Sequence, residues 1–92
     1  MVVGVMGWDI QVYEARSLKE KRAVVKSLKD RLRRLNLSVA ETGSQDLWQR
    51  AELTVCVVAT DRRGAEAMLD AADRLVEAEA LGRIIDSYRT FY

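Results

Sequence analysis

Apolar and polar residues alternate along two stretches of the chain, residues 2–12 and residues 50–60. Such alternation is typical of a β-strand that has one face in the core and the other toward solvent. It puts Trp8 on the apolar side of the first strand, where packing in the core is the expected role. The second face of residues 50–60 is only partly polar, because it carries Cys56 and Val58. That face leaves an apolar area that a partner protein would cover.

Two other stretches repeat their apolar residues with the 3.6-residue period of an α-helix. The first covers residues 18–34, and Ser17 followed by Glu20 fits a capping box at its start. Its apolar face is formed by Leu18, Val24, Val25, Leu28, Leu32 and Leu35. The second helix begins after Asp61, which can cap it, and ends at Gly82. Its apolar face is formed by Ala65, Met68, Leu69, Ala72, Leu75 and Val76.

Two further strands complete the pattern, at residues 37–41 and 83–92, and Asn36 can end the first helix. Gly43 and its polar neighbours predict a loop at residues 42–46. The sequence leaves open which side chains of the last strand face the core.

The order strand, helix, strand, strand, helix, strand predicts an α+β fold of the ferredoxin-like βαββαβ type. In that fold both helices cover one face of a four-stranded antiparallel sheet, whose strands lie in the order 4-1-3-2. A chain of 92 residues has room for one such unit, so we expect a single domain over residues 1–92.

Histidine is absent from the sequence, and Cys56 is the only cysteine. Without histidine the chain lacks the usual general base near neutral pH and the commonest metal ligand. We therefore expect no metal site, no cofactor and no enzymatic activity. No apolar run reaches the roughly 18 residues of a membrane span, and the N-terminal residues lack the pattern of a signal peptide. A cytoplasmic protein without membrane contact is expected.

Basic residues are concentrated in residues 16–34, which contain nine of the 15 lysines and arginines and only two acidic residues. Residues 61–80 have the opposite balance, with three basic and six acidic residues. On the first helix a stripe without carboxylates, bordered by Asp30, is formed by Lys19, Arg22, Lys26, Lys29 and Arg33. This basic stripe is interpreted either as a solvated helix face or as a surface for nucleic acid or an acidic partner. Because the stripe has no aromatic residue, RNA bound there would be held through its backbone.

The predicted topology brings separate segments together at one end of the sheet. The start of the first helix, with Arg16, Ser17 and Lys19, is expected to approach the loop between the two middle strands. That loop contributes Gln45, Asp46, Trp48, Gln49 and Arg50. Trp48 either folds back over the sheet edge or contacts a partner.

At the other end of the sheet, the first helix ends near the start of the second. Arg33 and Arg34 are therefore expected to lie near Arg62 and Arg63. Arginines in the first turn of a helix oppose its dipole, and the accumulated positive charge favours an anion such as phosphate. This makes Arg62 and Arg63 candidate anion-binding residues.

Two segments carry a specific resemblance. They are Arg16-Ser-Leu-Lys-Glu-Lys-Arg22, continued by Ser27-Leu-Lys-Asp-Arg31, and Gln45-Asp-Leu-Trp-Gln-Arg-Ala-Glu-Leu53. Both are similar to the signatures of the YlxP-like family of small bacterial proteins, a family of unknown function. The resemblance implies a ferredoxin-like fold and no established activity, and family genes often lie near those for a translation initiation factor and a ribosome-maturation factor. It also implies that the surface candidates are Arg16, Ser17, Lys19, Lys21, Arg22, Asp46, Trp48, Gln49 and Arg50.

Three functions compete on these observations. The leading hypothesis is a non-catalytic module that binds RNA or ribosomal particles in translation, through the basic stripe and the end of the sheet at Arg16 and Trp48. The alternative is a protein-interaction domain that self-associates as a homodimer through its open sheet face or edge. Minor alternatives are an acylphosphatase-like enzyme that uses Arg16 and a small-ligand regulatory domain.

Overall fold

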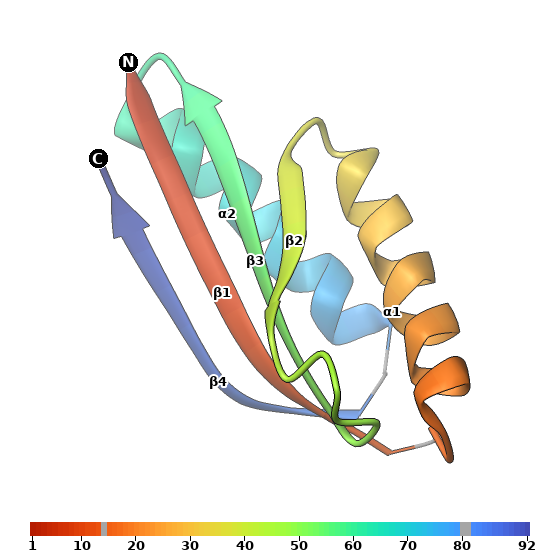
Figure 1. The fold of residues 1–92 in the computed structure, drawn as a ribbon. Coiled ribbons are helices and arrows are strands. Elements are labelled where there is room, and N and C mark those ends of the chain that lie inside the picture. The colour runs from red at the N-terminus through yellow and green to blue at the C-terminus, as the bar shows by residue number, and fades with distance from the viewer. Residues whose placement is uncertain (14, 80–81) are drawn as a thin grey trace.

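The computed structural model describes residues 1–13, 15–79 and 82–92. It contains the predicted order of elements, which are β1 (Val2–Val12), α1 (Leu18–Arg33), β2 (Ser38–Gly43), β3 (Arg50–Ala59), α2 (Arg62–Ala78) and β4 (Gly82–Phe91). The strands lie in the order β2-β3-β1-β4, and every neighbouring pair is antiparallel. The ferredoxin-like prediction and its strand order are therefore confirmed. Both helices lie on the same side of the sheet (Figure 1).

The core lies between the sheet and the two helices. The alternation of β1 and β3 turns one face of each strand toward the helices, and Trp8 is buried there, as predicted. The indole Nε1 of Trp8 donates a hydrogen bond of 2.9 Å to Asp73 of α2. That bond satisfies the polar atom of a buried aromatic side chain. Buried apolar side chains of β3 and the two helices complete the core, among them Val25, Leu28, Leu32, Leu53, Val55, Val57, Leu69 and Val76.

The two helix starts are capped as the sequence predicts, with one difference. Ser17 Oγ accepts from the amide of Glu20 at 3.1 Å, and Asp61 accepts from the amide of Gly64 at 2.7 Å. The Glu20 carboxylate, however, accepts from the amide of Arg16 rather than from that of Ser17. The box at α1 therefore spans one more residue and also fixes the backbone of Arg16.

The segment boundaries differ from the predictions at two glycines. Gly43 lies inside β2, opposite Glu52, so the loop begins at Ser44 instead of residue 42. Gly82 begins β4 instead of ending α2, whose last residue is Ala78. Close approach of the strands explains this second position, because a Cβ at Gly82 would overlap the carbonyl oxygen of Gln11.

A register shift settles which side chains of β4 face the core. Asp9 of β1 pairs with Asp86, but Ile10 pairs with Ile84, so Ile85 has no partner and bulges from the sheet. Ile84 packs against the core, whereas Ile85 is exposed. Simple alternation could not show this, because the bulge interrupts it.

Candidate functional site

The predicted basic stripe lies on the face of α1 that is turned away from the core. We call Arg16, Lys19, Arg22, Lys26, Lys29 and Arg33 the basic row, since Arg16 continues the stripe beyond the helix start. All of these residues are exposed except Lys29, which is partly buried. The row extends over the whole of α1, a helix of 16 residues and about 24 Å.

Asp30 is a member of this surface rather than only its border. Its carboxylate accepts from Lys26 Nζ at 2.9 Å and from Arg33 at 3.1 Å. The hydrogen bond from Lys26 is the main reason that the pKa of Asp30 is lowered, so the carboxylate stays charged at neutral pH. Among the described residues, the members of the row without an ion-pair partner are Arg16, Lys19, Arg22 and Lys29. The uncompensated charge therefore extends from Arg16, just before α1, to Lys29 in the second half of the helix.

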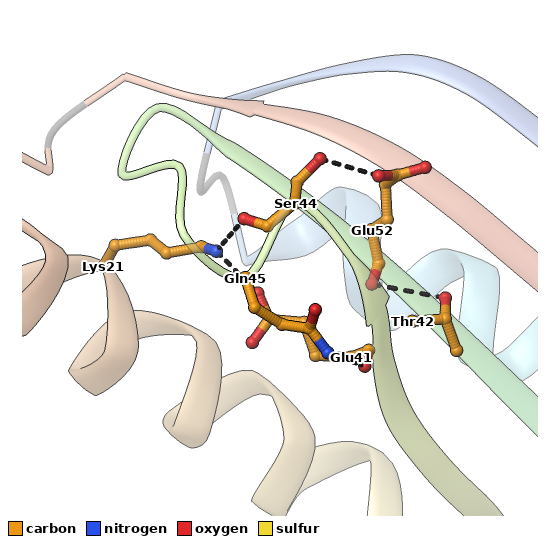
Figure 2. Close-up of polar contacts among 6 residues, drawn as sticks. All are labelled: Lys21, Glu41, Thr42, Ser44, Gln45 and Glu52. Atoms are coloured by element: carbon orange, nitrogen blue, oxygen red, sulfur yellow. Dashed lines mark hydrogen bonds and ion pairs between the residues drawn. The ribbon is translucent and has the colours of Figure 1, made fainter.

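Lys21 is not a surface residue, and the expectation that placed it on the surface is wrong. Its side chain is 0 % exposed, and Nζ donates to Glu41 at 2.6 Å and to the carbonyl of Ser44 at 2.8 Å (Figure 2). The physical reason is helical spacing, since Lys21 lies four residues before Val25 on the face that packs against the sheet. A buried ammonium requires such partners, and this pair ties α1 to the end of β2.

Further hydrogen bonds fix the first residues of the β2–β3 loop, residues 44–49. Ser44 Oγ donates to Glu52 at 2.6 Å, and Gln45 Nε2 donates to the carbonyl of Glu41 at 3.1 Å. Ser44 also adopts a φ of 58°, a left-handed conformation that is uncommon outside glycine. Figure 2 shows that the Lys21 ammonium approaches Ser44 and Glu41 from one side and that Glu52 contacts Ser44 from the other. The start of the loop is thus held from α1, β2 and β3.

The other end of the loop is held on the open face of the sheet, which the helices do not cover. Arg50 donates to both carboxylate oxygens of Asp9, at 2.7 and 2.8 Å. Hydrogen bonding between these two side chains is the main reason that the pKa of Asp9 is lowered and the pKa of Arg50 is raised. The amide of Val12 donates to the carbonyl of Gln49 at 2.8 Å, which fixes the backbone next to Arg50.

A groove of about 340 Å³ lies beside this anchored loop. We call it the Trp48 groove, and it is lined by Gln11, Leu47, Trp48, Gln49, Arg50 and Ile85. Trp48 is 39 % exposed, so its indole is partly covered and partly open to solvent. The loop and the start of α1 lie at the same end of the molecule (Figure 1). The predicted meeting of these segments is confirmed, but Lys21 makes the contact, whereas Trp48, Gln49 and Arg50 lie beside β1 and β4.

The predicted cluster of arginines at the opposite end does not form. Arg31 of α1 makes an ion pair with Glu79, which caps the end of α2. The second half of α1 therefore crosses the end of α2, and Figure 1 shows the end of α1 and the start of α2 well apart. Arg62 instead donates to Glu66 at 3.1 Å and lies 4.3 Å from the centre of the Phe91 ring. The Arg62 guanidinium therefore already has an acidic and an aromatic partner. Arg63 is exposed, and it has no ion-pair partner among the described residues.

The amino-acid sequence of residues 3–89 matches the family described as "Protein of unknown function (DUF503)". The chain belongs to the DUF503 family. A relative in this group, "Uncharacterized protein YlxP" of Bacillus subtilis (strain 168), is 39% identical over 62 residues, which are 66% of this chain and 67% of the relative. The resemblance to YlxP-like proteins is therefore confirmed, and it carries no established activity.

Solved structures share the fold of this family member. A de novo designed protein with a ferredoxin fold superposes with a TM-score of 0.54 and 19% identity, over 100% of this chain and 83% of the designed one. SnoaB, a cofactor-independent oxygenase from Streptomyces nogalater, gives a TM-score of 0.54 and 16% identity, over 99% and 90% of the two chains. At such identities the likeness shows the fold alone.

Within residues 1–13, 15–79 and 82–92, no group of three or more acidic or cysteine side chains could hold a metal ion. Neither helix in the same ranges is long and apolar enough to cross a membrane.

The sequence did not reveal several residues that build the site. Glu41 was assigned to a strand without a role, and Gln11 and Ile85 were not connected with Trp48. The helical spacing of Lys21 from Val25 was an available signal that this lysine faces inward. The bulge at Ile85 has no comparable signal in the sequence.

Proposed function

We propose that this chain is a non-catalytic, cytoplasmic module that binds RNA through the basic row of α1. The observation that carries the proposal is that Arg16, Lys19, Arg22 and Lys29 follow one side of α1 without an ion-pair partner among the described residues. The first three are exposed, and Lys29 is partly buried. Residues 16–34 contain nine basic and two acidic side chains. Glu41 and Glu79 compensate two of these charges from other elements, which leaves a strong positive excess.

Phosphate backbones are the partner that such a surface fits. A protein that neutralises phosphates releases condensed counterions, and this release supplies much of the binding free energy. The row recurs about once per helical turn, so several phosphates along a strand can each meet one basic side chain. A solvated helix face would instead distribute carboxylates among its basic residues. Among the described residues, the carboxylate that forms ion pairs within the row is that of Asp30.

Single-stranded or looped RNA is favoured over a duplex because an aromatic side chain lies near the start of the row. Binding sites for single strands combine a basic surface with aromatic platforms for the bases. The β2–β3 loop, residues 44–49, carries Trp48 and lies at the same end of the molecule as the start of α1 (Figure 1). In a bacterial cell this chemistry fits ribosomal RNA or an assembling ribosomal particle, and a role in translation follows from that partner.

The test compares two charge reversals of equal size on the two helices. Lys19→Glu with Arg22→Glu is expected to weaken binding to a fluorescein-labelled single-stranded oligoribonucleotide at least roughly tenfold at low salt, measured by fluorescence anisotropy. Arg63→Glu with Arg74→Glu changes the net charge equally but lies on α2, and it should change the affinity far less. Equal losses, or a loss confined to the α2 variant, would contradict the proposal. Tighter binding of a poly-glutamate peptide than of RNA would instead indicate an acidic protein partner.

A homodimer through the open sheet face is a second candidate. Val58 and Tyr88 are both exposed on that face, and Tyr88 lies across Gly7, where a Cβ would collide with its ring. Both side chains therefore present apolar surface on the sheet face that the helices do not cover. Sedimentation velocity at rising protein concentration tests it, with Val58→Asp as the variant expected to stay monomeric. Identical sedimentation of both proteins would argue against the dimer.

A further inference from the structure

We infer that the Trp48 groove is the subsite for one unpaired nucleobase of the bound RNA. The inference rests on the proposed RNA binding and adds where, and by which side chains, a base is held. Its starting point is the mixed chemistry of the lining. Trp48, Leu47 and Ile85 contribute apolar surface, whereas Gln11, Gln49 and Arg50 contribute polar groups.

The apolar part of the groove suits a flat ring. Leu47 and Ile85 are exposed, and Trp48, which is partly covered, lines the same groove. Stacking of a base on an aromatic side chain contributes about 1–3 kcal/mol in single-strand binding sites. The volume of about 340 Å³ is at the small end of ligand pockets, which suits a single ring system better than an extended ligand.

The polar part of the groove can read the edge of that ring. Gln11 and Gln49 each carry a carboxamide, which donates and accepts hydrogen bonds as the edges of nucleobases do. Arg50 carries five N–H donors, and its two bonds to Asp9 leave others for a carbonyl oxygen or ring nitrogen. Asp9 also fixes the plane of the guanidinium, so Arg50 needs little reordering when a base arrives.

The groove is preorganised by contacts at both ends of its loop. Lys21 and Glu52 hold Ser44 at the start, and the amide of Val12 holds Gln49 near the end. Lys21 belongs to the same helix turn as Lys19 and Arg22, which are members of the basic row. The groove lies on the open face of the sheet and the row on the outer face of α1, but the loop and the start of α1 share one end of the molecule (Figure 1). A strand whose phosphates follow the row would therefore reach the groove by passing around this end.

Tryptophan fluorescence tests the subsite because the two tryptophans differ in environment. Trp8 is buried and hydrogen-bonded to Asp73, whereas Trp48 is open to ligand. Addition of a short unlabelled single-stranded oligoribonucleotide should quench the wild-type emission, and Trp48→Phe should lose that quenching while it retains most of the affinity. Trp48→Ala should weaken single-strand binding by about 5- to 100-fold, the equivalent of one stacked base, and leave binding of duplex RNA unchanged.

The outcomes separate the subsite from the proposed function. Suppose that RNA binds and that Lys19→Glu with Arg22→Glu weakens the binding, but that Trp48→Ala leaves the affinity unchanged and RNA does not quench the wild-type emission. The groove inference is then wrong, and the proposed function stands. If RNA binds to none of the proteins, the proposed function itself fails. Circular dichroism melting shows whether each variant is folded. If Trp48→Ala is unfolded, the quenching measurement with Trp48→Phe still tests the subsite. Gln11→Ala should reduce discrimination among the four homopolymers, and unchanged discrimination would overturn the role of its carboxamide.

Discussion

Two ion pairs flank the β2–β3 loop, and their environments are opposite. Lys21 and Glu41, before the loop, have side chains that are 0 % and 15 % exposed. Arg50 and Asp9, after the loop, are 44 % and 26 % exposed. A buried pair is costly to break because one charge is then left without a partner, whereas an exposed pair is exchanged for water at little cost. The comparison indicates that the first pair builds the fold and that the second leaves Arg50 available to a ligand.

The same contrast applies to the lysines and arginines of α1. Lys21 has the side-chain chemistry of its neighbours Lys19 and Arg22, but only Lys21 faces the sheet. Basic residues of one helix therefore have two roles: those on the inner face stabilise the fold, and those on the outer face are available to a partner. Breaking the buried pair should therefore cost more stability than breaking the exposed pair.

Removal of the buried ammonium should have the largest effect. Lys21→Ala leaves Glu41 and the carbonyl of Ser44 without their donor, so the free energy of unfolding should fall by about 2–4 kcal/mol, less than for a fully buried pair because Glu41 is slightly exposed. Urea denaturation measures the loss. Lys19→Ala is the matched control on the exposed face and should change stability by no more than about 0.5 kcal/mol.

A second variant shows whether the charge or the packing matters at this position. Lys21→Met combined with Glu41→Leu removes both charges and keeps apolar volume, and such replacements of a buried pair are often neutral. Most of the stability lost in Lys21→Ala should therefore return. Equal stability of Lys21→Ala and Lys19→Ala would contradict the assignment of Lys21 to the core.

The next effect concerns Ser44, the loop residue that contacts both Lys21 and Glu52. Ser44→Ala removes the hydroxyl that donates to the Glu52 carboxylate and should lower the free energy of unfolding by about 1–2 kcal/mol. Ser44→Gly loses the same hydrogen bond but adopts the φ of 58° freely, so its loss should be smaller. A greater loss in the glycine variant would show that the left-handed backbone is not a constraint here.

The smallest effect belongs to the exposed pair, and it depends on pH. Arg50 lowers the pKa of Asp9 below its value of 3.8 in an unstructured chain. The stabilisation is therefore present above the unfolded pKa and is lost as the pH falls through the lower, folded pKa. Asp9→Asn should be slightly less stable than the wild type at pH 7, and the difference should vanish at strongly acidic pH or in high salt. A difference that grows on acidification would contradict this sign.

Much of the fold was predictable because the alternation of β1 and β3 and the helical period of α1 are regular. Trp8, Leu28 and Leu32 could be assigned to the core from those periods alone. The helical spacing of Lys21 from Val25 puts it on the inner face, but full burial of its ammonium depends on Glu41 and Ser44, which lie outside the helix. Its burial is a tertiary property.

Only the part of the candidate site that depends on local periodicity could be predicted from the sequence. Local periodicity was sufficient to identify the basic row, but the compensation of Lys26 and Arg33 by Asp30 depends on side-chain conformations. The sequence does not predict where Arg62 lies, because the way the two helices cross cannot be read from either helix alone. The ion pair of Arg31 with Glu79 reveals that crossing. The Trp48 groove depends on the bulge at Ile85, which only the register of β4 defines.

The central claim is that the outer face of α1 binds a phosphate backbone while its inner face only builds the fold. It is tested most directly by the slope of log K against log salt concentration for a single-stranded oligoribonucleotide. Lys19→Gln with Arg22→Gln and Lys29→Gln should reduce the magnitude of the slope by about 2, since each phosphate contact on a single strand contributes about 0.7. Lys21→Met with Glu41→Leu should leave the slope unchanged. An unchanged slope in the outer-face variant, or equal reductions in both, would contradict the claim.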